Sequence, residues 1–173
     1  HWEIDTVVSG VGTSPTCLLT LTERKTRFEI VRKIEQRTMD AVTRELDILE
    51  RQIGVLSFRR MFKTVTGDNG SEFSDIAGLE RSAVSKQPRL SLFFAHPYSS
   101  FERGTNENHN GIIRRFIPKG VDIGDYSKQV VRATQDWMNS YPRKILKGLT
   151  PLMALCAELG SEFRTPGILE VKT

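Results

Sequence analysis

Two polar segments of this sequence deliver carboxylates where apolar stretches end. The first, TGDNGSEF at residues 66–73, carries Asp68 directly after a predicted strand, and the second, RGTNEN at residues 103–108, carries Glu107. A third acid, Asp5, lies inside an apolar run near the start of the sequence. Carboxylates that strand ends bring together can hold divalent metal ions, and such ions can cut phosphodiester bonds.

Metal-dependent cleavage of this kind makes definite demands on the residues around it. Two cations roughly 3.5–4 Å apart activate an attacking water or hydroxyl and stabilise the leaving oxygen. Mg²⁺ prefers oxygen ligands and keeps several waters, so a few acids suffice without histidines. Alternation in the first strand puts Trp2 and Ile4 on one face and Glu3 and Asp5 on the other. A central strand would hold Asp5 rigidly, because its backbone is paired on both sides.

Each acid taken alone also has an ordinary structural explanation. Asp68-Asn69-Gly70 is a strong turn signal and often means nothing more. Glu107 fits an acid in the first turn of a helix, where the helix dipole favours it. Asp5 fits a polar residue on the solvated face of a strand. The chemistry becomes credible only through the combination of the three and their order.

The elements that must position these acids follow from the hydrophobic pattern. We expect strands at residues 2–8, 17–21, 28–31, 62–66 and 90–95, a helix at 41–53, a short helix at 73–84, and further helices at 106–116, 126–141 and 152–159. The fold class is therefore α/β, with three antiparallel strands, parallel strands added through helical crossovers, and helices flanking the five-stranded mixed sheet. In the helix at 126–141 we expect the stripe of Trp137 and Tyr141 to face the core.

Several motifs together resemble one known family. WEID at residues 2–5, TGDNGSEF at 66–73 and RGTNEN at 103–108 resemble the three acidic motifs of DDE transposases and retroviral-type integrases. SSFE at 99–102, YPRK at 141–144 and GLTP at 148–151 fit the same pattern, which spans nearly the whole chain. The sequence looks most like the insertion-sequence-thirty transposases of bacteria.

The resemblance implies a ribonuclease-H-like fold and two Mg²⁺ ions, for which Mn²⁺ substitutes. It implies DNA cleavage by water at the end of a mobile element, followed by attack of the freed 3′ hydroxyl on target DNA. Asp5, Asp68 and Glu107 carry over as catalytic metal ligands. Two alternatives stay open: a ribonuclease-H-like nuclease, and a non-catalytic DNA-binding or assembly module on the same fold.

The third acid has a competitor in Glu102. Asp68 is separated from Glu102 by 33 residues and from Glu107 by 38, and the shorter gap is nearer the habit of the family. The family's glutamate, however, belongs to the Gly-Thr-Asn-Glu string, which ends here at Glu107. We therefore choose Glu107. We do not expect Glu3 or Glu72 to belong to the triad. Glu3 lies near the start of its strand, away from the other two acids, and Glu72 suits the start of a helix.

Basic and polar residues around the third acid and near the end of the sequence are expected to bind DNA. They are Arg103, Asn108, Arg114, Arg115, Lys119, Arg143 and Lys144. Phosphate contacts of this kind give affinity and salt dependence rather than sequence choice. Each basic residue has the alternative of a solvated helix face, and Asn108 that of a helix cap. His96 and His109 are expected to be packing or surface residues and not metal ligands.

Composition sets the remaining limits. The 173 residues suit one catalytic core domain, residues 1–173, and the net charge of +4 is compatible with a polyanionic partner without requiring one. No apolar run reaches the length of a membrane span, and Cys17 and Cys156 lack zinc-site spacing, which suits a bacterial cytoplasm. The family resemblance implies a DNA-end-recognition domain outside this chain and a homo-oligomer, nucleoid-associated when active, that holds transposon ends and target DNA.

Overall fold

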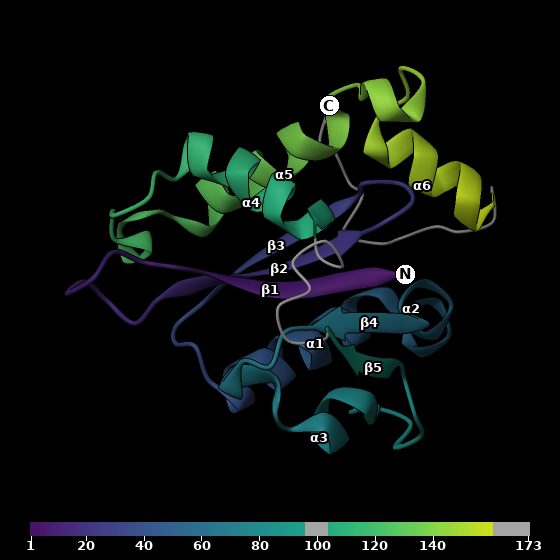
Figure 1. Ribbon diagram of the computed structural model, residues 1–173. Helices are drawn as coiled ribbons and strands as arrows, with labels where there is room; N and C mark the ends of the chain where they lie inside the picture. Colours follow the sequence, from purple (N-terminus) through teal and green to yellow (C-terminus); the bar gives the residue numbers. More distant parts are fainter. Residues whose placement is uncertain (96–103, 161–173) are drawn as a thin grey trace.

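The computed structural model describes residues 1–95 and 104–160, and its centre is a five-stranded sheet in the order β3-β2-β1-β4-β5 (Figure 1). The strands are β1 (Trp2–Val8), β2 (Cys17–Glu23), β3 (Glu29–Ile34), β4 (Thr64–Gly67) and β5 (Ser91–Phe94). β1 to β3 form an antiparallel meander, while β4 lies parallel to both β1 and β5. The predicted mixed sheet is confirmed, and β1 is its middle strand.

Helices cover both faces of this sheet. They are α1 (Met39–Ile53), α2 (Val55–Met61), α3 (Ile76–Glu80), α4 (Gly104–Phe116), α5 (Lys128–Ser140) and α6 (Pro151–Leu159). Figure 1 shows α1 and α3 on one side of the sheet and α4 and α5 on the other. Short 3₁₀ turns complete the described chain: η1 (Ser71–Phe73), η3 (Ile123–Asp125) and η4 (Lys144–Leu146). Three antiparallel strands, two parallel additions and helices on both faces are the ribonuclease-H-like arrangement that the sequence predicted.

Local sequence explains most of these elements. Trp2 and Ile4 belong to the core beneath α1, while Val7 joins a second core beneath α4 and α5, as the alternation in β1 requires. The apolar face of α1 is buried as predicted, and the Thr38 hydroxyl caps its start by accepting from the Ala41 N–H. Gly54, with φ of +84°, ends α1 and lets the chain turn directly into α2.

Two boundaries differ from prediction. The segment expected to be one helix at 73–84 is divided into η1 and α3, because the Asp75 side chain accepts from the Gly78 N–H and starts a new helix there. The helix α2, whose Phe58 and Met61 are buried, was not predicted from the sequence. This helix ends at Met61 with Phe62 as its C-cap, so β4 starts at Thr64 and not at residue 62 as expected.

The orientation of α5 was predicted wrongly. Its buried residues are Val131, Thr134, Gln135, Met138 and Asn139, whereas Trp137 is 37% and Tyr141 51% exposed. The reason is that β3 is an edge strand whose outer backbone groups need partners. Gln135 Oε1 accepts from the Val31 N–H at 3.0 Å, and the Asn139 amide accepts from the N–H of Glu29 and donates to its carbonyl at 2.9 and 2.7 Å.

Two further observations bear on expectations from composition. Cys17 and Cys156 are free thiols, and burial raises the pKa of Cys17 to about 11, although the nearby Arg37 charge acts in the opposite direction. Among the helices of residues 1–95 and 104–160, none has both the length and the apolar character needed to cross a bilayer.

Candidate active site

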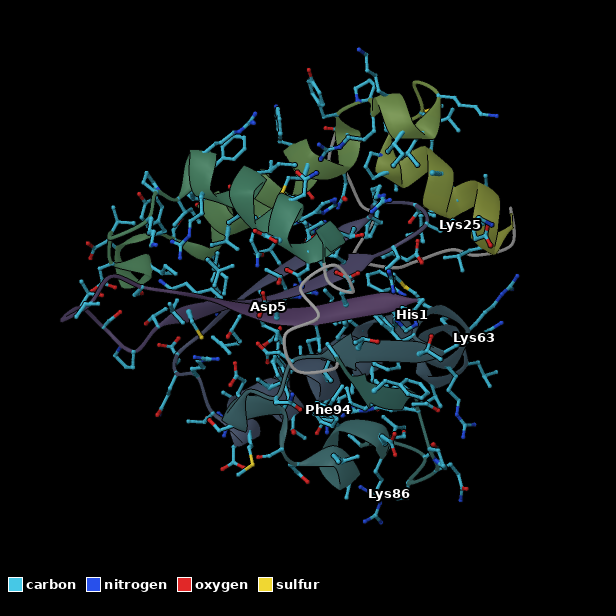
Figure 2. All side chains as sticks on the ribbon, in the orientation of Figure 1. His1, Asp5, Lys25, Lys63, Lys86 and Phe94 are labelled. Carbon is cyan, nitrogen blue, oxygen red and sulfur yellow. The ribbon has the colours of Figure 1, made fainter. Side chains whose placement is uncertain are left out.

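Asp5 lies on the middle strand of the sheet, on the face covered by α4 (Figure 2). Its side chain is half-buried, and its Oδ2 accepts a hydrogen bond from Asn110 Nδ2 of α4 at 2.8 Å. The amide oxygen of Asn110, Oδ1, is buried and has no hydrogen-bond partner within the described part of the chain. The predicted central position of β1 is confirmed; Asp5 pairs with Thr20 of β2, the register with β4 covers Trp2 and Glu3, and α4 is tied directly to the Asp5 side chain.

Asp68 directly follows β4, the neighbour of β1. In the parallel register Glu3 lies opposite Thr66, and two residues further along each chain come Asp5 and Asp68. Both acids therefore lie at the same level of adjacent strands, Asp5 in the middle of β1 and Asp68 directly after β4. Asp68 Oδ1 accepts from the Gly70 N–H at 2.9 Å, which closes the turn that its sequence predicted.

Gly70 is required in this turn for a steric reason. A Cβ at this position would lie 2.5 Å from Glu72 Oε2 and 2.8 Å from Asp68 Oδ1. The oxygens of two carboxylates thus approach the same point, and a side chain larger than hydrogen would displace them. The carboxylates of Asp68 and Glu72 therefore converge at this turn.

Glu72 is a site residue whose role the sequence did not reveal. It was expected to be an ordinary helix-start acid, but its side chain is only 1% exposed. Glu72 Oε1 accepts from the Thr6 hydroxyl at 2.7 Å and pairs with Arg37 Nε at 2.5 Å, while Oε2 is buried with no hydrogen-bond partner in residues 1–95 and 104–160. A buried carboxylate held in this way is a fixed negative charge beside Asp68.

Arg37 supplies the positive charge for this group of acids. The hydrogen bond to Glu72 raises the pKa of Arg37, and the negative charges of Glu72, Asp68 and Asp5 raise it further, against the opposing effect of burial. One guanidinium therefore faces all three carboxylates from the loop between β3 and α1. No signal in the sequence marked Arg37, because its importance depends on residues far away along the chain.

Glu107 lies in the first turn of α4 and is exposed. The start of this helix is fixed by Glu3, which is fully buried: its Oε2 accepts from the Asn106 N–H at 2.8 Å, and its Oε1 lies 3.1 Å from Arg24 Nε. Glu3 is thus an anchor for the start of the helix. Asn110, which binds Asp5, comes one helical turn after Glu107.

The three predicted acids are not gathered into a ready metal site. In the ranges 1–95 and 104–160, no group of three or more Asp, Glu, His or Cys side chains is arranged to hold a metal ion. The donors nevertheless suit Mg²⁺, since Asp5 and Asp68 are oxygen ligands that already face a shared cation, Arg37. The buried, unpartnered Oδ1 of Asn110 beside Asp5 is a further acceptor that a hydrated ion would satisfy.

Two hollows flank α4. The first is lined by Gly104, Glu107, Asn108, Gly111, Ile112 and Arg115, and the second by Arg27, Gly104, Thr105, Asn108, His109, Ile112, Arg143 and Ile145. They share Gly104, Asn108 and Ile112 and therefore lie next to each other on the helix, and we call the two together the α4 groove.

The residues predicted to bind DNA are distributed unevenly around this groove. Asn108, Arg115 and Arg143 line it, and Lys119 and Lys144 are exposed elsewhere. Arg114 instead donates to the backbone carbonyls of Val8 and Pro118, at 2.7 and 3.2 Å. Arg103, like Glu102 and His96, lies outside the described residues.

His109 is a packing residue, as predicted. Its Nδ1 lies 2.6 Å from Glu29 Oε2, which also accepts from the Thr22 hydroxyl at 2.7 Å, and both His109 and Glu29 are buried between α4 and the sheet. Burial raises the pKa of Glu29, although the hydrogen bonds from His109 and Thr22 oppose the rise. This pair stabilises the docking of α4 and takes no direct part in the group of acids around Asp5.

Known proteins resemble this chain over most of its length. A probable transposase for the insertion-like sequence element IS1161 from Streptococcus salivarius is 36% identical over 146 residues, which are 83% of this chain and 38% of that protein. The transposase for insertion sequence element IS4351 from Bacteroides fragilis is 32% identical over 152 residues, 86% of this chain and 42% of that protein. The chain is a relative of the insertion-sequence transposases.

A third relative supports the narrower resemblance. Transposase InsI for insertion sequence element IS30A from Escherichia coli strain K12 is 31% identical over 151 residues, 87% of this chain and 36% of that protein. The predicted likeness to the insertion-sequence-thirty transposases is thereby confirmed. No protein-family model matches the chain. The chain spans about two fifths of the length of these transposases.

Proposed function

We propose that this chain is the catalytic core of a DNA transposase that cleaves DNA strands and joins them to a target, with Asp5, Asp68 and Glu107 as its DDE triad. The observation that carries the proposal is the placement of Asp5 and Asp68 at the same level of adjacent parallel strands, facing a common positive charge. The similarity to named transposases supports the same reaction class.

Each residue has a distinct task in this proposal. Asp5 and Asp68 would hold divalent ions, Mg²⁺ or Mn²⁺, and Glu107 would complete the site from α4. Ions bound there lower the pKa of an attacking water or hydroxyl and stabilise the leaving oxygen. Asn110 orients Asp5 through its hydrogen bond, and Glu3 fixes the start of the helix that carries Glu107.

The protein's own groups would also orient the DNA. Arg115 and Asn108 line the same hollow as Glu107, so a phosphate held by Arg115 lies next to the third acid. The start of α4 adds the positive end of a helix dipole, which favours negative charge there. We further propose that the active form is a homo-oligomer that binds element ends and target DNA through the basic residues named above.

The test is metal-dependent cleavage and joining of terminal-repeat DNA by the protein. We expect Asp68→Asn and Glu107→Gln each to abolish the Mn²⁺-dependent reaction while the variants keep their folded circular-dichroism spectrum. Glu102→Gln is the matched control and is expected to keep activity. If Glu102→Gln is inactive and Glu107→Gln active, the assignment of the third acid is wrong. If Asp68→Asn cleaves as well as the parent, the triad itself is wrong.

A further inference from the structure

Three aromatic side chains form a stack on the outer side of α4 and α5. The ring centroids of Phe116 and Trp137 are 5.0 Å apart, and those of Trp137 and Tyr141 are 4.9 Å apart with nearly parallel planes. The three are 38%, 37% and 51% exposed. Large aromatic residues contribute most to stability when they are buried, so an exposed stack of three suggests a surface for binding.

Positive charge is concentrated at one end of this stack. The guanidinium carbon of Arg143 lies 5.9 Å from the centre of the Tyr141 ring. Burial lowers the pKa of Arg143, the charges of Glu29 and Tyr141 oppose this change, and the charge of Arg115 adds to it. Arg143 Nη2 donates to the Met138 carbonyl at 3.2 Å, which holds the guanidinium beside α5.

The charged end of the stack continues into the α4 groove. Arg115 lines the hollow that contains Glu107, and Arg143 lines the hollow on the other side of Asn108 and Ile112. A path therefore leads from Glu107 across α4 to Arg143, and from there to the ring of Tyr141. A bound molecule following this path meets cations first and aromatic faces at its end.

We propose that this surface, formed by Arg115, Arg143, Tyr141, Trp137 and Phe116, binds an unpaired stretch of DNA at the end being processed. The arginines bind its phosphates, and the exposed rings of Tyr141 and Trp137 stack on its bases. Aromatic rings can stack in this way only on bases that are free of the duplex. The proposal rests on the proposed function, since it places the unpaired strand next to Glu107.

Charge favours DNA over a second copy of the chain. In a symmetric dimer whose twofold axis passes through this surface, Arg115 and Arg143 would face their own counterparts. Such like charges repel, whereas a polyanion neutralises both. Because α5 exposes apolar side chains, a dimer formed through this face is the alternative that the test must distinguish.

The test measures binding by the 173-residue chain in EDTA, so that no cleavage occurs. The probes are a blunt duplex and the same duplex with a short unpaired 3′ tail that carries 2-aminopurine. We expect tighter binding of the tailed duplex and quenching of the 2-aminopurine fluorescence by stacking. Tyr141→Ala and Trp137→Ala should each weaken binding of the tail about tenfold, with little change for the blunt duplex. Trp137→Phe should keep most of the affinity for the tail.

Val130→Ala is the matched control, because Val130 is 42% exposed on the same helix and carries no aromatic ring. Equal binding of both probes by the parent, or a tail preference that survives Tyr141→Ala, would overturn the proposal. So would a dimer in analytical ultracentrifugation that Trp137→Ala and Val130→Ala both dissociate. Asp68→Asn separates the proposed triad from the proposed tail binding. We expect this variant to bind the tail as the parent does, whether or not Asp68 proves to be catalytic.

Discussion

Asn110 of α4 donates a hydrogen bond to the Asp5 carboxylate of β1, with 2.8 Å between Nδ2 and Oδ2. The two residues are 105 positions apart in sequence, and Glu107 lies one helical turn before Asn110. This contact relates the helix that carries one predicted acid to the strand that carries another. Asn110 is therefore a positioning residue for the proposed site.

Replacing Asn110 should loosen this relationship without unfolding the protein. We expect Asn110→Ala to reduce Mn²⁺ affinity and Mn²⁺-dependent cleavage by about tenfold, because residues that orient metal ligands typically contribute 10- to 100-fold. Isothermal titration with Mn²⁺ and cleavage of terminal-repeat DNA measure the two effects. Gln129→Ala, which removes an exposed amide from α5, is the control and should change neither quantity.

Arg37 and Glu72 should be energetically coupled. Arg37→Ala leaves the buried Glu72 charge without its cation, so we expect the free energy of unfolding to fall by about 1–3 kcal/mol. The same substitution should cost clearly less in a Glu72→Gln background, where the charge is gone. Urea denaturation of the four proteins measures the coupling, with Arg44→Ala on α1 as an exposed control. Equal costs in the two backgrounds would show that the pair does not interact.

His109 and Glu29 should make stability depend on pH in a defined direction. Burial raises the pKa of Glu29 above its usual 4.5, and loss of His109 removes the main opposing interaction. A carboxyl whose folded-state pKa is raised contributes its full stability below 4.5 and loses it as the pH rises through the folded-state value. The destabilisation caused by His109→Ala should thus be larger near neutrality than at pH 4.5, where only the packing of the buried imidazole ring is lost.

Urea denaturation of the parent and His109→Ala at a series of pH values measures this difference. Glu3, whose negative charge also raises the pKa of Glu29, is present in both proteins, so its effect cancels in the difference between them. A difference that does not change between pH 4.5 and neutrality would contradict the effect of His109 on the raised pKa of Glu29.

Asn139 should be important for the edge of the sheet. Asn139→Leu keeps the branched shape of the side chain but leaves the N–H and carbonyl of Glu29 without partners, so we expect a loss of about 2–4 kcal/mol. Hydrogen exchange should become faster at the Glu29 amide. Ser140→Ala, one residue away and exposed, is the control. Unchanged exchange at Glu29 in Asn139→Leu would contradict the proposed protection of the edge.

The parts of the fold that depend on local pattern could be predicted from the sequence. The alternation of Trp2, Glu3, Ile4 and Asp5 gave the faces of β1 correctly, since side chains in a strand alternate whatever surrounds it. The apolar period of α1 was equally informative. The positions of Asp68 after β4 and Glu107 in the first turn of α4 also followed from turn and helix-start signals.

Features that depend on distant partners could not be predicted. Gln135 and Asn139 look like solvent-facing residues until β3 is known to be an unprotected edge more than 100 positions earlier. Their burial forces Trp137 outward, against the expectation from apolar periodicity. Glu72 likewise resembles an ordinary helix-start acid until Thr6 and Arg37 are found beside it.

The most direct test of the central claim is to locate Mn²⁺ by anomalous scattering in crystals of the protein soaked with the ion. We predict Mn²⁺ bound by Asp5 and Asp68, with Glu107 completing the site, and no Mn²⁺ in the same soak of Asp68→Asn. Mn²⁺ ligated by Glu102 in place of Glu107, or bound away from Asp5 and Asp68, would contradict the proposed triad.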